Sequence, residues 1–218
     1  MERREYNMVR KNKAVDQRRQ EILETALKLF VSKGYEKTST NDIMEALELS
    51  RGGLYHHFRS KEEILDTAIR TFFEEEICRI REILDDENRE ATEKLKYLIE
   101  YDSASQPMFQ DVNTIIHTKE NPTLITHLLQ IKMELVTPLF VQIIEQGIAE
   151  GMFQCQYPEE VSKIAVILST LLFSDTIIPM NREEFQRMVT VFQRTAEVMV
   201  GAKPGAFDFM TQSIELGK

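Results

Sequence analysis

The stretch Thr38–Lys61, TSTNDIMEALELSRGGLYHHFRSK, predicts two short helices joined by a tight turn. Ser39 or Thr40 is suited to cap the first helix, because either hydroxyl accepts a hydrogen bond from a free amide at a helix start. The apolar residues of this helix recur at the spacing of one helical face, namely Ile43, Ala46 and Leu47. The first helix is therefore expected to pack one side against a core.

The second helix of this stretch carries the more informative surface. Ser50 is suited to cap it, and Leu54 and Phe58 lie four residues apart, so both are expected to face inward. The residues near the opposite face are Arg51, Gly52, Tyr55 and Arg59. A helix that enters the major groove of DNA needs long donors for base edges and small residues where its backbone approaches the duplex. This face therefore predicts a DNA-binding helix.

The Gly52–Gly53 pair is unusual inside a helix. Each helical glycine costs about 1 kcal/mol relative to alanine, so the pair requires a reason, and close approach to DNA is one. The alternative is an ordinary small helical hairpin with a slack second helix and no role in DNA binding.

From Ala14 to Ile69 the chain resembles the amino-terminal DNA-binding domain of the TetR/AcrR family of bacterial transcriptional regulators. Two pieces carry the resemblance, ILETALKLFVSKGYEKTSTNDIMEAL and LSRGGLYHHFRSKEEIL. It implies an all-α fold, with an N-terminal three-helix helix-turn-helix domain and a larger C-terminal helical domain for ligand binding and dimerisation. The expected divisions are a flexible basic arm at 1–15, the DNA-binding domain at 16–60, the helical domain at 61–202 and a tail at 203–218.

The family motif also implies which residues contact DNA. Matched position by position, it marks Thr40, Asn41, Arg51, Gly52, Gly53, Tyr55, His56, His57 and Lys61. The first two open the supporting helix against the DNA backbone, and Arg51 is expected to contact a base edge while the glycines allow close approach. Tyr55, His56 and Lys61 are expected to bind phosphates, whereas His57 points between the two faces of its helix.

The net charge of −9 is divided unevenly along the chain. Residues 1–61 contain 13 Lys and Arg against 9 Asp and Glu, for +4, whereas residues 62–218 contain 14 against 27, for −13. Contacts to phosphates are local and dominate affinity for DNA, so the basic first part matters more than the acidic total. The uneven charge predicts a DNA-binding first domain joined to a second domain that has a different function.

Composition and motifs narrow the other possibilities. No apolar run approaches the roughly 18 residues of a membrane span, and the charged amino terminus lacks the apolar core of a signal peptide, so a cytoplasmic location without membrane contact is expected. Cys78 and Cys155 are far apart and are expected to be small buried residues, with no disulfide framework and no metal site. The sequence contains no nucleophile-elbow, P-loop or dinucleotide-binding motif, so we expect no catalytic residue and no cofactor.

The chain before the helix-turn-helix stretch has two parts. Met1–Val15 is polar and basic without an amphipathic period, and it is either an arm that contacts DNA or a solvated tail. Asp16–Lys33 is predicted as a helix that ends before Gly34, a residue suited to the left-handed position just past a helix.

A long helix is predicted to leave the DNA-binding domain. Ser60 and Glu63 have the spacing of a capping box, and the apolar stripe that follows continues to about Leu84. In the TetR/AcrR family the helix at this position transmits movement between the ligand site and the DNA-binding domain, and the resemblance implies the same role here.

The rest of the chain is periodic and helical from Ala91 onward. Breaks are predicted at Gln106–Pro107, Asn121–Pro122, Glu150–Gly151 and Ile178–Pro179, with a kink or helix end at Pro138. In the family, the last two long helices form a four-helix dimer interface. The resemblance thus implies a homodimer through Val161, Ile164, Leu168, Leu172, Phe185, Met188, Phe192 and Met199. The alternative is that both stripes fill the core of one protomer.

The family resemblance also implies a ligand site in the second domain. The candidate lining residues are Met108, Phe109, Ile116, His117, Met133, Phe140 and Phe173. Aromatic residues and methionines suit an adaptable pocket and equally suit an ordinary helical core. Glu134 and Asp175 are acids within apolar segments, and each is either a group for a cationic ligand or a residue at the solvent edge of its helix.

Three functions remain open on the sequence alone. The favoured one is a repressor that binds an inverted-repeat operator in double-stranded DNA and is released by a small-molecule inducer. The second is a helical DNA-binding activator or architectural protein without such a ligand. The third is a helical enzyme or protein-interaction module that carries a helix-turn-helix domain.

Overall fold

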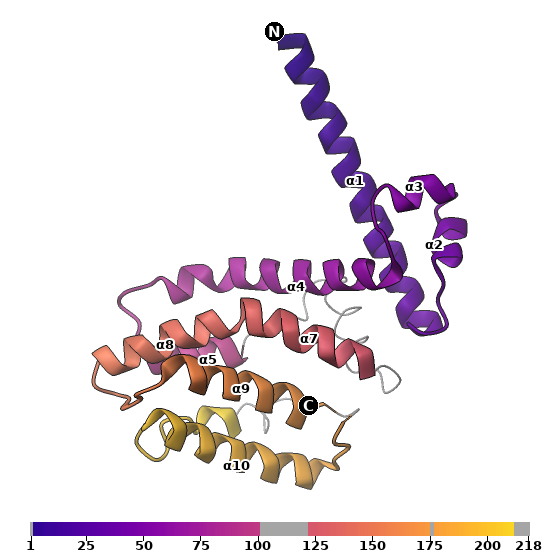
Figure 1. The fold of residues 1–218 in the computed structure, drawn as a ribbon. Helices are drawn as coiled ribbons and strands as arrows, with labels where there is room; N and C mark the ends of the chain where they lie inside the picture. The colour runs from indigo at the N-terminus through magenta and orange to yellow at the C-terminus, as the bar shows by residue number, and fades with distance from the viewer. Residues whose placement is uncertain (1, 101–121, 175–176, 212–218) are drawn as a thin grey trace. The chain divides into compact units, whose positions relative to one another are not determined.

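The computed structural model describes residues 2–100, 122–174 and 177–211, and helices are the regular elements of this part of the chain (Figure 1). The described residues divide into two compact units, the first ending at Phe72 and the second beginning at Phe73. The predicted all-α fold is confirmed.

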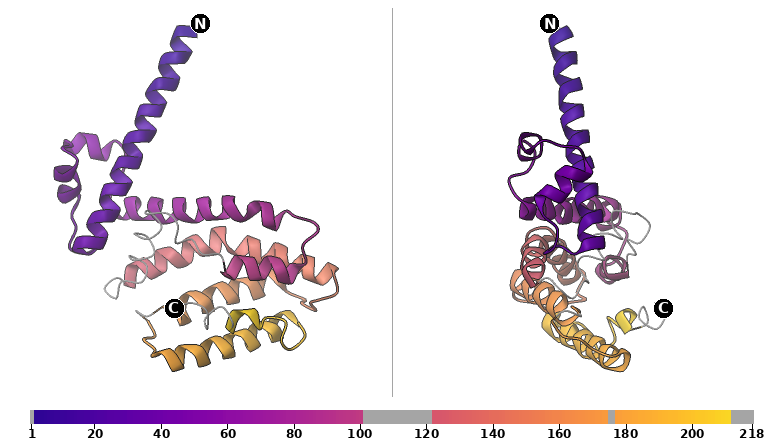
Figure 2. Two further views of the ribbon diagram at one scale, coloured as in Figure 1. Left: turned by 180° about the vertical axis from the view of Figure 1, so that it is seen from behind. Right: turned by 90° about the vertical axis from the view of Figure 1, so that its right-hand side faces the viewer.

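The first helix, α1 (Glu2–Lys33), begins earlier than the predicted start at Asp16. Residues 2–15, expected as a flexible arm, are helical and extend away from the rest of the first unit (Figures 1 and 2). Neither Gly nor Pro occurs between Glu2 and Lys33, and residues with good helix propensity such as Glu, Arg, Lys and Ala are frequent. The helix ends where predicted, and Gly34 has the left-handed φ of +89° that stops it.

Three further helices build the first unit: α2 (Thr40–Ala46), α3 (Arg51–Tyr55) and the part of α4 (Lys61–Leu84) up to Phe72. Their inward side chains are buried together with those of α1, among them Ile22, Leu27, Ile43, Leu54, Phe58, Ile64 and Ile69. The predicted apolar stripe of α2 is confirmed only for Ile43, since Leu47 is half-buried and Ala46 is exposed. The helix ends at Ala46, so its last turn leaves the core.

Serine side chains cap all three of these helices. Ser39 forms a full capping box at the start of α2, and the hydroxyl of Ser50 accepts the amide of the third residue of α3 (3.1 Å). Ser60 accepts the amide of Glu63 (3.2 Å), but the Glu63 carboxylate accepts from the Arg59 amide (2.6 Å) instead of the predicted Ser60 amide. Glutamate is one methylene longer than the aspartate of the Ser39 box, and it extends past the cap.

The second unit is a set of packed helices. They are the remainder of α4, α5 (Ala91–Glu100), α7 (Pro122–Leu135), α8 (Thr137–Ala149), α9 (Pro158–Leu172) and α10 (Arg182–Val200). The helices change where proline and glycine predicted it: Pro122 begins α7, Pro138 lies in the first turn of α8, and Gly151 follows α8 with a φ of +74°. The predicted break at Gln106–Pro107 and Asn121 of the predicted break at Asn121–Pro122 lie outside the described residues.

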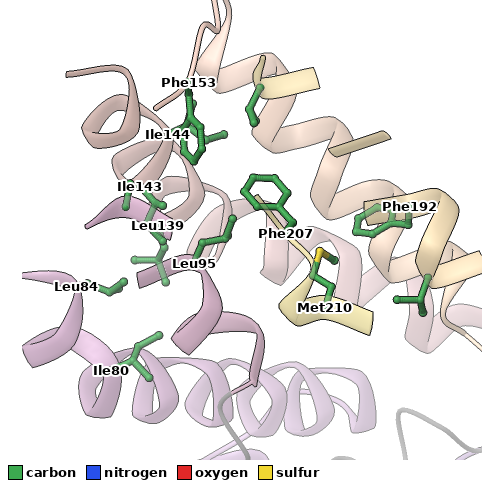
Figure 3. Packing of buried hydrophobic residues seen from close by; sticks show 13 residues of the cluster. Ile80, Leu84, Leu95, Leu139, Ile143, Ile144, Phe153, Phe192, Phe207 and Met210 are labelled. Carbon is green, nitrogen blue, oxygen red and sulfur yellow. The ribbon is translucent and has the colours of Figure 1, made fainter. Parts of the chain in front are cut away.

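A continuous apolar cluster holds these helices together (Figure 3). Helix α9 contacts α7, α8 and α10, and α5 packs on α8 (Figures 1 and 2). The packing is close where α8 meets the segment after it, because a Cβ built on Gly147 would lie 2.2 Å from the ring of Phe153. The close packing of this cluster thus depends on the missing side chain at Gly147 as well as on the apolar side chains that fill it.

The segment after α10 was expected to be part of a tail, but its described residues contribute to this core. Phe207 and Met210 are 2% and 8% exposed and project into the cluster (Figure 3). The buried Glu197 carboxylate fixes the segment by accepting the amides of Gly205 (3.0 Å) and Phe207 (3.1 Å). Burial raises the pKa of Glu197, but hydrogen bonds from Phe207 and Arg194 outweigh it and leave the pKa below its ordinary value.

None of the described helices is by itself long and apolar enough to cross a membrane. The pair Ile125–Leu135 and Thr137–Ala149 meets the length and composition limits together, with a bend of 42° between the two helices. Both helices contribute buried side chains to the second unit, including Leu128, Ile131 and Ile143.

Candidate nucleic-acid interface

The exposed face of α3 has the composition that the sequence predicted. Leu54 and Phe58, each 1% exposed, anchor the helix and the residues that follow it. On the other side, Arg51, Gly52, Tyr55, His56 and Arg59 are exposed. Because α3 is a short helix fixed from within by two large side chains, these groups have a defined direction before any DNA binds.

The turn between α2 and α3 fixes the relation of the two helices. The amide of Leu49 donates to the carbonyl of Met44 (2.8 Å), and Glu48 has a left-handed φ of +52°. On the outer surface, the hydroxyls of Thr40 and Tyr55 are 3.5 Å apart, so the start of α2 touches the end of α3. This is the compact arrangement of a helix-turn-helix motif.

Arg51 lies over the ring of Tyr55. The guanidinium carbon is 5.7 Å from the ring centroid, a cation–π distance that orients the arginine without consuming its N–H donors. The same donors have the fork geometry that matches the O6 and N7 acceptors of guanine. Arg51 is therefore exposed and oriented, as base recognition requires.

Arg19 of α1 is a residue that sequence reasoning missed. Its guanidinium donates to the carbonyl of His57 (2.8 Å) and to the hydroxyl of Thr67 on α4 (3.4 Å), and it lies 4.2 Å above the ring of Phe58. Arg19 thus joins α1, the end of α3 and α4 at one point. The contacts span 38 and 48 residues of sequence, so no local pattern predicts them.

Lys61 and His57, two of the predicted DNA-contacting residues, are partly covered by other parts of the protein. Lys61 is half-buried, and its ammonium donates to the carbonyl of Tyr35 (2.7 Å) and lies 4.1 Å from the centroid of the Tyr35 ring. His57 is also half-buried, and burial together with the nearby His56, Arg19 and Arg18 lowers its pKa. His57 therefore has less tendency than an ordinary histidine to carry a charge toward phosphate.

The two glycines of α3 differ in what surrounds them. A Cβ built on Gly52 meets nothing within 4 Å, whereas one on Gly53 lies 3.2 Å from the Leu49 side chain and 3.3 Å from the Ser50 hydroxyl. A methyl group at Gly53 would thus be tightly placed, with Leu49 and Ser50 shifted by a few tenths of an ångström, whereas one at Gly52 would meet no neighbour. No contact within the described part of the protein therefore explains why residue 52 has no side chain.

Gly52→Ala is accordingly expected to retain or raise thermal stability, by up to about 1 kcal/mol from helix propensity. It is expected to weaken operator binding by about tenfold, because a methyl group enters the surface that approaches the groove. Gly53→Ala is the matched variant, and it is expected to gain less stability than Gly52→Ala because its methyl group meets Leu49 and Ser50. Thermal melts and fluorescence-anisotropy titrations measure both effects. Gly52→Ala with unchanged operator affinity would remove Gly52 from the interface.

The predicted ligand-lining residues fall into two groups. Met108, Phe109, Ile116 and His117 lie outside the described residues, as does Asp175. Met133 and Phe140 are half-buried, and the Met133 sulfur accepts from the Thr137 hydroxyl (3.8 Å). Phe173 stacks edge-on against Phe185 (5.5 Å) and Phe192 (5.4 Å), so it packs between α9 and α10. Glu134 is exposed, which agrees with the solvent-edge alternative.

The residues predicted for the dimer interface also differ in how exposed they are. Phe192 is 7% exposed and part of the core of its own protomer, which agrees with the alternative given for this residue, and Val161, Leu168, Leu172 and Phe185 pack against that core. Met188 and Met199 are half-buried, and Ile164 is 45% exposed. The most exposed apolar residues of α10 are Val191 (61%) and Val198 (81%), which the sequence-based stripe omitted. Helical spacing places both valines on one side of α10, about 100–120° around the helix from Phe192, a signal available in the sequence.

Metal and thiol chemistry have no support in the described part of the chain. No group of three His, Cys, Asp or Glu side chains there is placed to hold a metal ion. Both cysteines are free; Cys155 is half-buried, but Cys78 is exposed, contrary to the expectation of two buried thiols.

The geometry of α2, the turn and α3 defines a helix-turn-helix DNA-binding protein. The chain belongs to the TetR family of bacterial transcriptional regulators: the profile of bacterial regulatory proteins of the tetR family matches residues 22–74, and that of the tetracyclin repressor-like C-terminal domain matches residues 103–195. The protein is thus a transcriptional regulator and not an enzyme.

Relatives support this membership. The HTH-type transcriptional repressor KstR2 of Mycobacterium tuberculosis is 31% identical over 147 residues, which are 64% of this chain and 71% of that protein. Among solved structures, Salmonella enterica GusR has a TM-score of 0.60 at 20% identity, covering 85% of this chain and 96% of that one. A putative TetR-family regulator from Syntrophomonas wolfei has a TM-score of 0.57 at 24% identity, with 87% and 98% covered. These structures support the fold.

Proposed function

We propose that the protein is a homodimeric repressor that binds an inverted-repeat operator and is released from it by a small apolar or amphipathic ligand. The observation that carries the proposal is the exposed face of α3, with an oriented Arg51 beside a glycine that the fold does not require. The description of KstR2 as a repressor supports repression over activation.

Dimerisation follows from the size of the DNA-binding surface. One α3 presents only a few side chains to the groove, so specific binding requires two copies at a fixed separation. A two-fold dimer places its two α3 helices about one helical turn of DNA apart, roughly 34–36 Å, or a multiple of that distance. The exposed Ile164 of α9 and the Val191 and Val198 of α10 are the surface that we assign to the second copy.

Ligand release requires a link between the second unit and the DNA-binding unit. Helix α4 is continuous from Lys61 to Leu84, so it begins beside the interface and ends in the second unit. A ligand that favours the protomer arrangement with the wrong α3 separation lowers operator affinity, and operator lowers ligand affinity by the same factor. Arg19 joins α4 to α3, so movement of α4 is transmitted to the recognition helix.

The test compares two variants on operator and on random DNA. Arg51→Ala is expected to cost about 1–3 kcal/mol on the operator and little on random DNA, because a base contact is lost. His56→Ala removes an exposed residue that is expected to contact a phosphate and not a base, so it is expected to weaken both DNAs alike. Arg81→Ala, an exposed arginine of α4 in the second unit, is the control and should change neither. An equal loss on both DNAs for Arg51→Ala would refute its role in base recognition.

A further inference from the structure

The orientation of α3 depends on its contacts with other helices. With five residues, α3 is too short to be stable by itself, so its direction is set by the groups that join it to the rest of the first unit. Leu54 and Phe58 hold it through apolar contacts, which fix its depth but have no preferred direction. A directional contact is needed to fix the angle at which the helix presents Arg51.

Arg19 supplies directional contacts at the carboxyl end of α3. One guanidinium nitrogen donates to the carbonyl of His57 (2.8 Å), just past the helix, and another donates to the hydroxyl of Thr67 on α4 (3.4 Å). The guanidinium is planar and its N–H groups have fixed directions, so the two hydrogen bonds define how the end of α3 lies relative to α4. The guanidinium carbon is also 4.2 Å from the centroid of the Phe58 ring, so the same group holds the apolar anchor.

The charge and the half-buried position of Arg19 strengthen these contacts. Carbonyl groups at the end of a helix carry partial negative charge, so a guanidinium is favoured beside them. Hydrogen bonds from a charged donor are stronger than neutral ones, and partial burial limits competition from water. A lysine has the same charge but only one nitrogen, so it cannot reproduce the fork that joins α3 to α4. The shape of the side chain at position 19 therefore matters as well as its charge.

We infer that Arg19 is a positioning residue for operator recognition, which sets the angle of α3 and thereby the base pairs that Arg51 and its neighbours meet. It does so without contacting DNA itself. The inference rests on the proposed recognition of an operator by α3, and it adds a residue outside the DNA-contacting set.

The lengths involved show why a small tilt is enough. Arg51 and His57 are six residues apart, which is about 9 Å along a helix. If the end at His57 is released, a tilt of about 10° displaces the end at Arg51 by about 1.5 Å over that length. A hydrogen bond tolerates only about 0.5 Å in its donor–acceptor distance, so a bidentate contact to a base does not survive this displacement.

Two other roles for Arg19 lead to different results. A phosphate contact would be lost on operator and on random DNA alike. A purely structural role would reduce the fraction of folded protein and leave the preference for the operator unchanged in the protein that remains folded. A positioning role lowers that preference itself.

The test measures operator preference in variants of Arg19. The original chain first selects an operator duplex from a random-sequence library. Anisotropy titrations with this duplex, with its single-base-pair variants and with random DNA then compare the original chain, Arg19→Met and Arg19→Lys. Lys28→Met is the control, because it removes an exposed lysine of the same helix. Thermal melts accompany each titration, and Arg19→Lys carries the comparison if Arg19→Met does not remain folded.

Both Arg19 variants should lose about tenfold in affinity for the operator and less than about twofold for random DNA, with weaker discrimination at every base pair that α3 contacts. Lys28→Met should keep the operator preference of the original chain. In an Arg51→Ala background, either Arg19 variant should cost no more than about threefold, because the contact that it would displace is already missing.

An unchanged operator preference in either folded Arg19 variant, an equal loss on both DNAs, or full additivity with Arg51→Ala would overturn the inference. Failure of the proposed function is a different observation. In that case the original chain selects no operator, or Arg51→Ala loses equally on operator and on random DNA.

Discussion

Replacing Val191 and Val198 together by glutamate is expected to convert the proposed dimer into a folded monomer and to lower operator affinity by roughly 10²–10⁴-fold. The two valines are 61% and 81% exposed on one face of α10, so the charges enter no core. The loss is large because the second α3 helix of a dimer binds its half-site as an intramolecular event, and a monomer lacks that advantage. Light scattering gives the oligomeric state, and anisotropy titration gives the affinity.

Two further variants serve as controls for this prediction. Ile99→Glu places a charge on an exposed apolar residue of α5 and is expected to leave both the dimer and its operator affinity unchanged. Phe192→Glu is expected to unfold the second unit, because its ring lies in the core, 5.4 Å from that of Phe173. If the double glutamate variant remains a dimer with full affinity, the contact between protomers lies elsewhere.

Ligand and operator are expected to oppose each other with equal strength. A coupling free energy of about 3 kcal/mol would weaken operator binding about 150-fold at saturating ligand, and saturating operator would weaken ligand binding by the same factor. Ligands recovered from cell extract by their release of the operator complex can be titrated in both directions by calorimetry. A ligand that binds the second unit tightly, with an affinity that operator does not change, would favour a regulator without an inducer.

Local patterns predicted the helices and most of their ends, although α1 begins well before its predicted start. Ser39, Ser50 and Gly34 act where the sequence placed them, because caps and left-handed stops depend on residues within one turn. The same holds for the inward pair Leu54 and Phe58 and for the exposed face that opposes it. These features determine the candidate DNA-binding surface, so this part of the site was accessible from sequence.

Features that depend on distant contacts were not accessible. The buried positions of Phe207 and Met210 depend on Glu197 and on helices far away in sequence, and the segment around them has no period. A stripe on α10 indicated an apolar face, but only packing shows that Phe192 serves the core while Val198 faces outward. The contacts of Arg19 are likewise tertiary, so its residue type alone gave no signal.

Footprinting of the purified protein on the DNA upstream of its own gene tests the proposed operator recognition most directly. The expected result is one protected region that contains an inverted repeat, with half-site centres about 34–36 Å apart or at a multiple of that distance. Arg51→Ala, at unchanged thermal stability, should abolish the protection at the same protein concentration. Protection without a repeat, or equal protection by Arg51→Ala, would contradict recognition of an operator by the exposed face of α3.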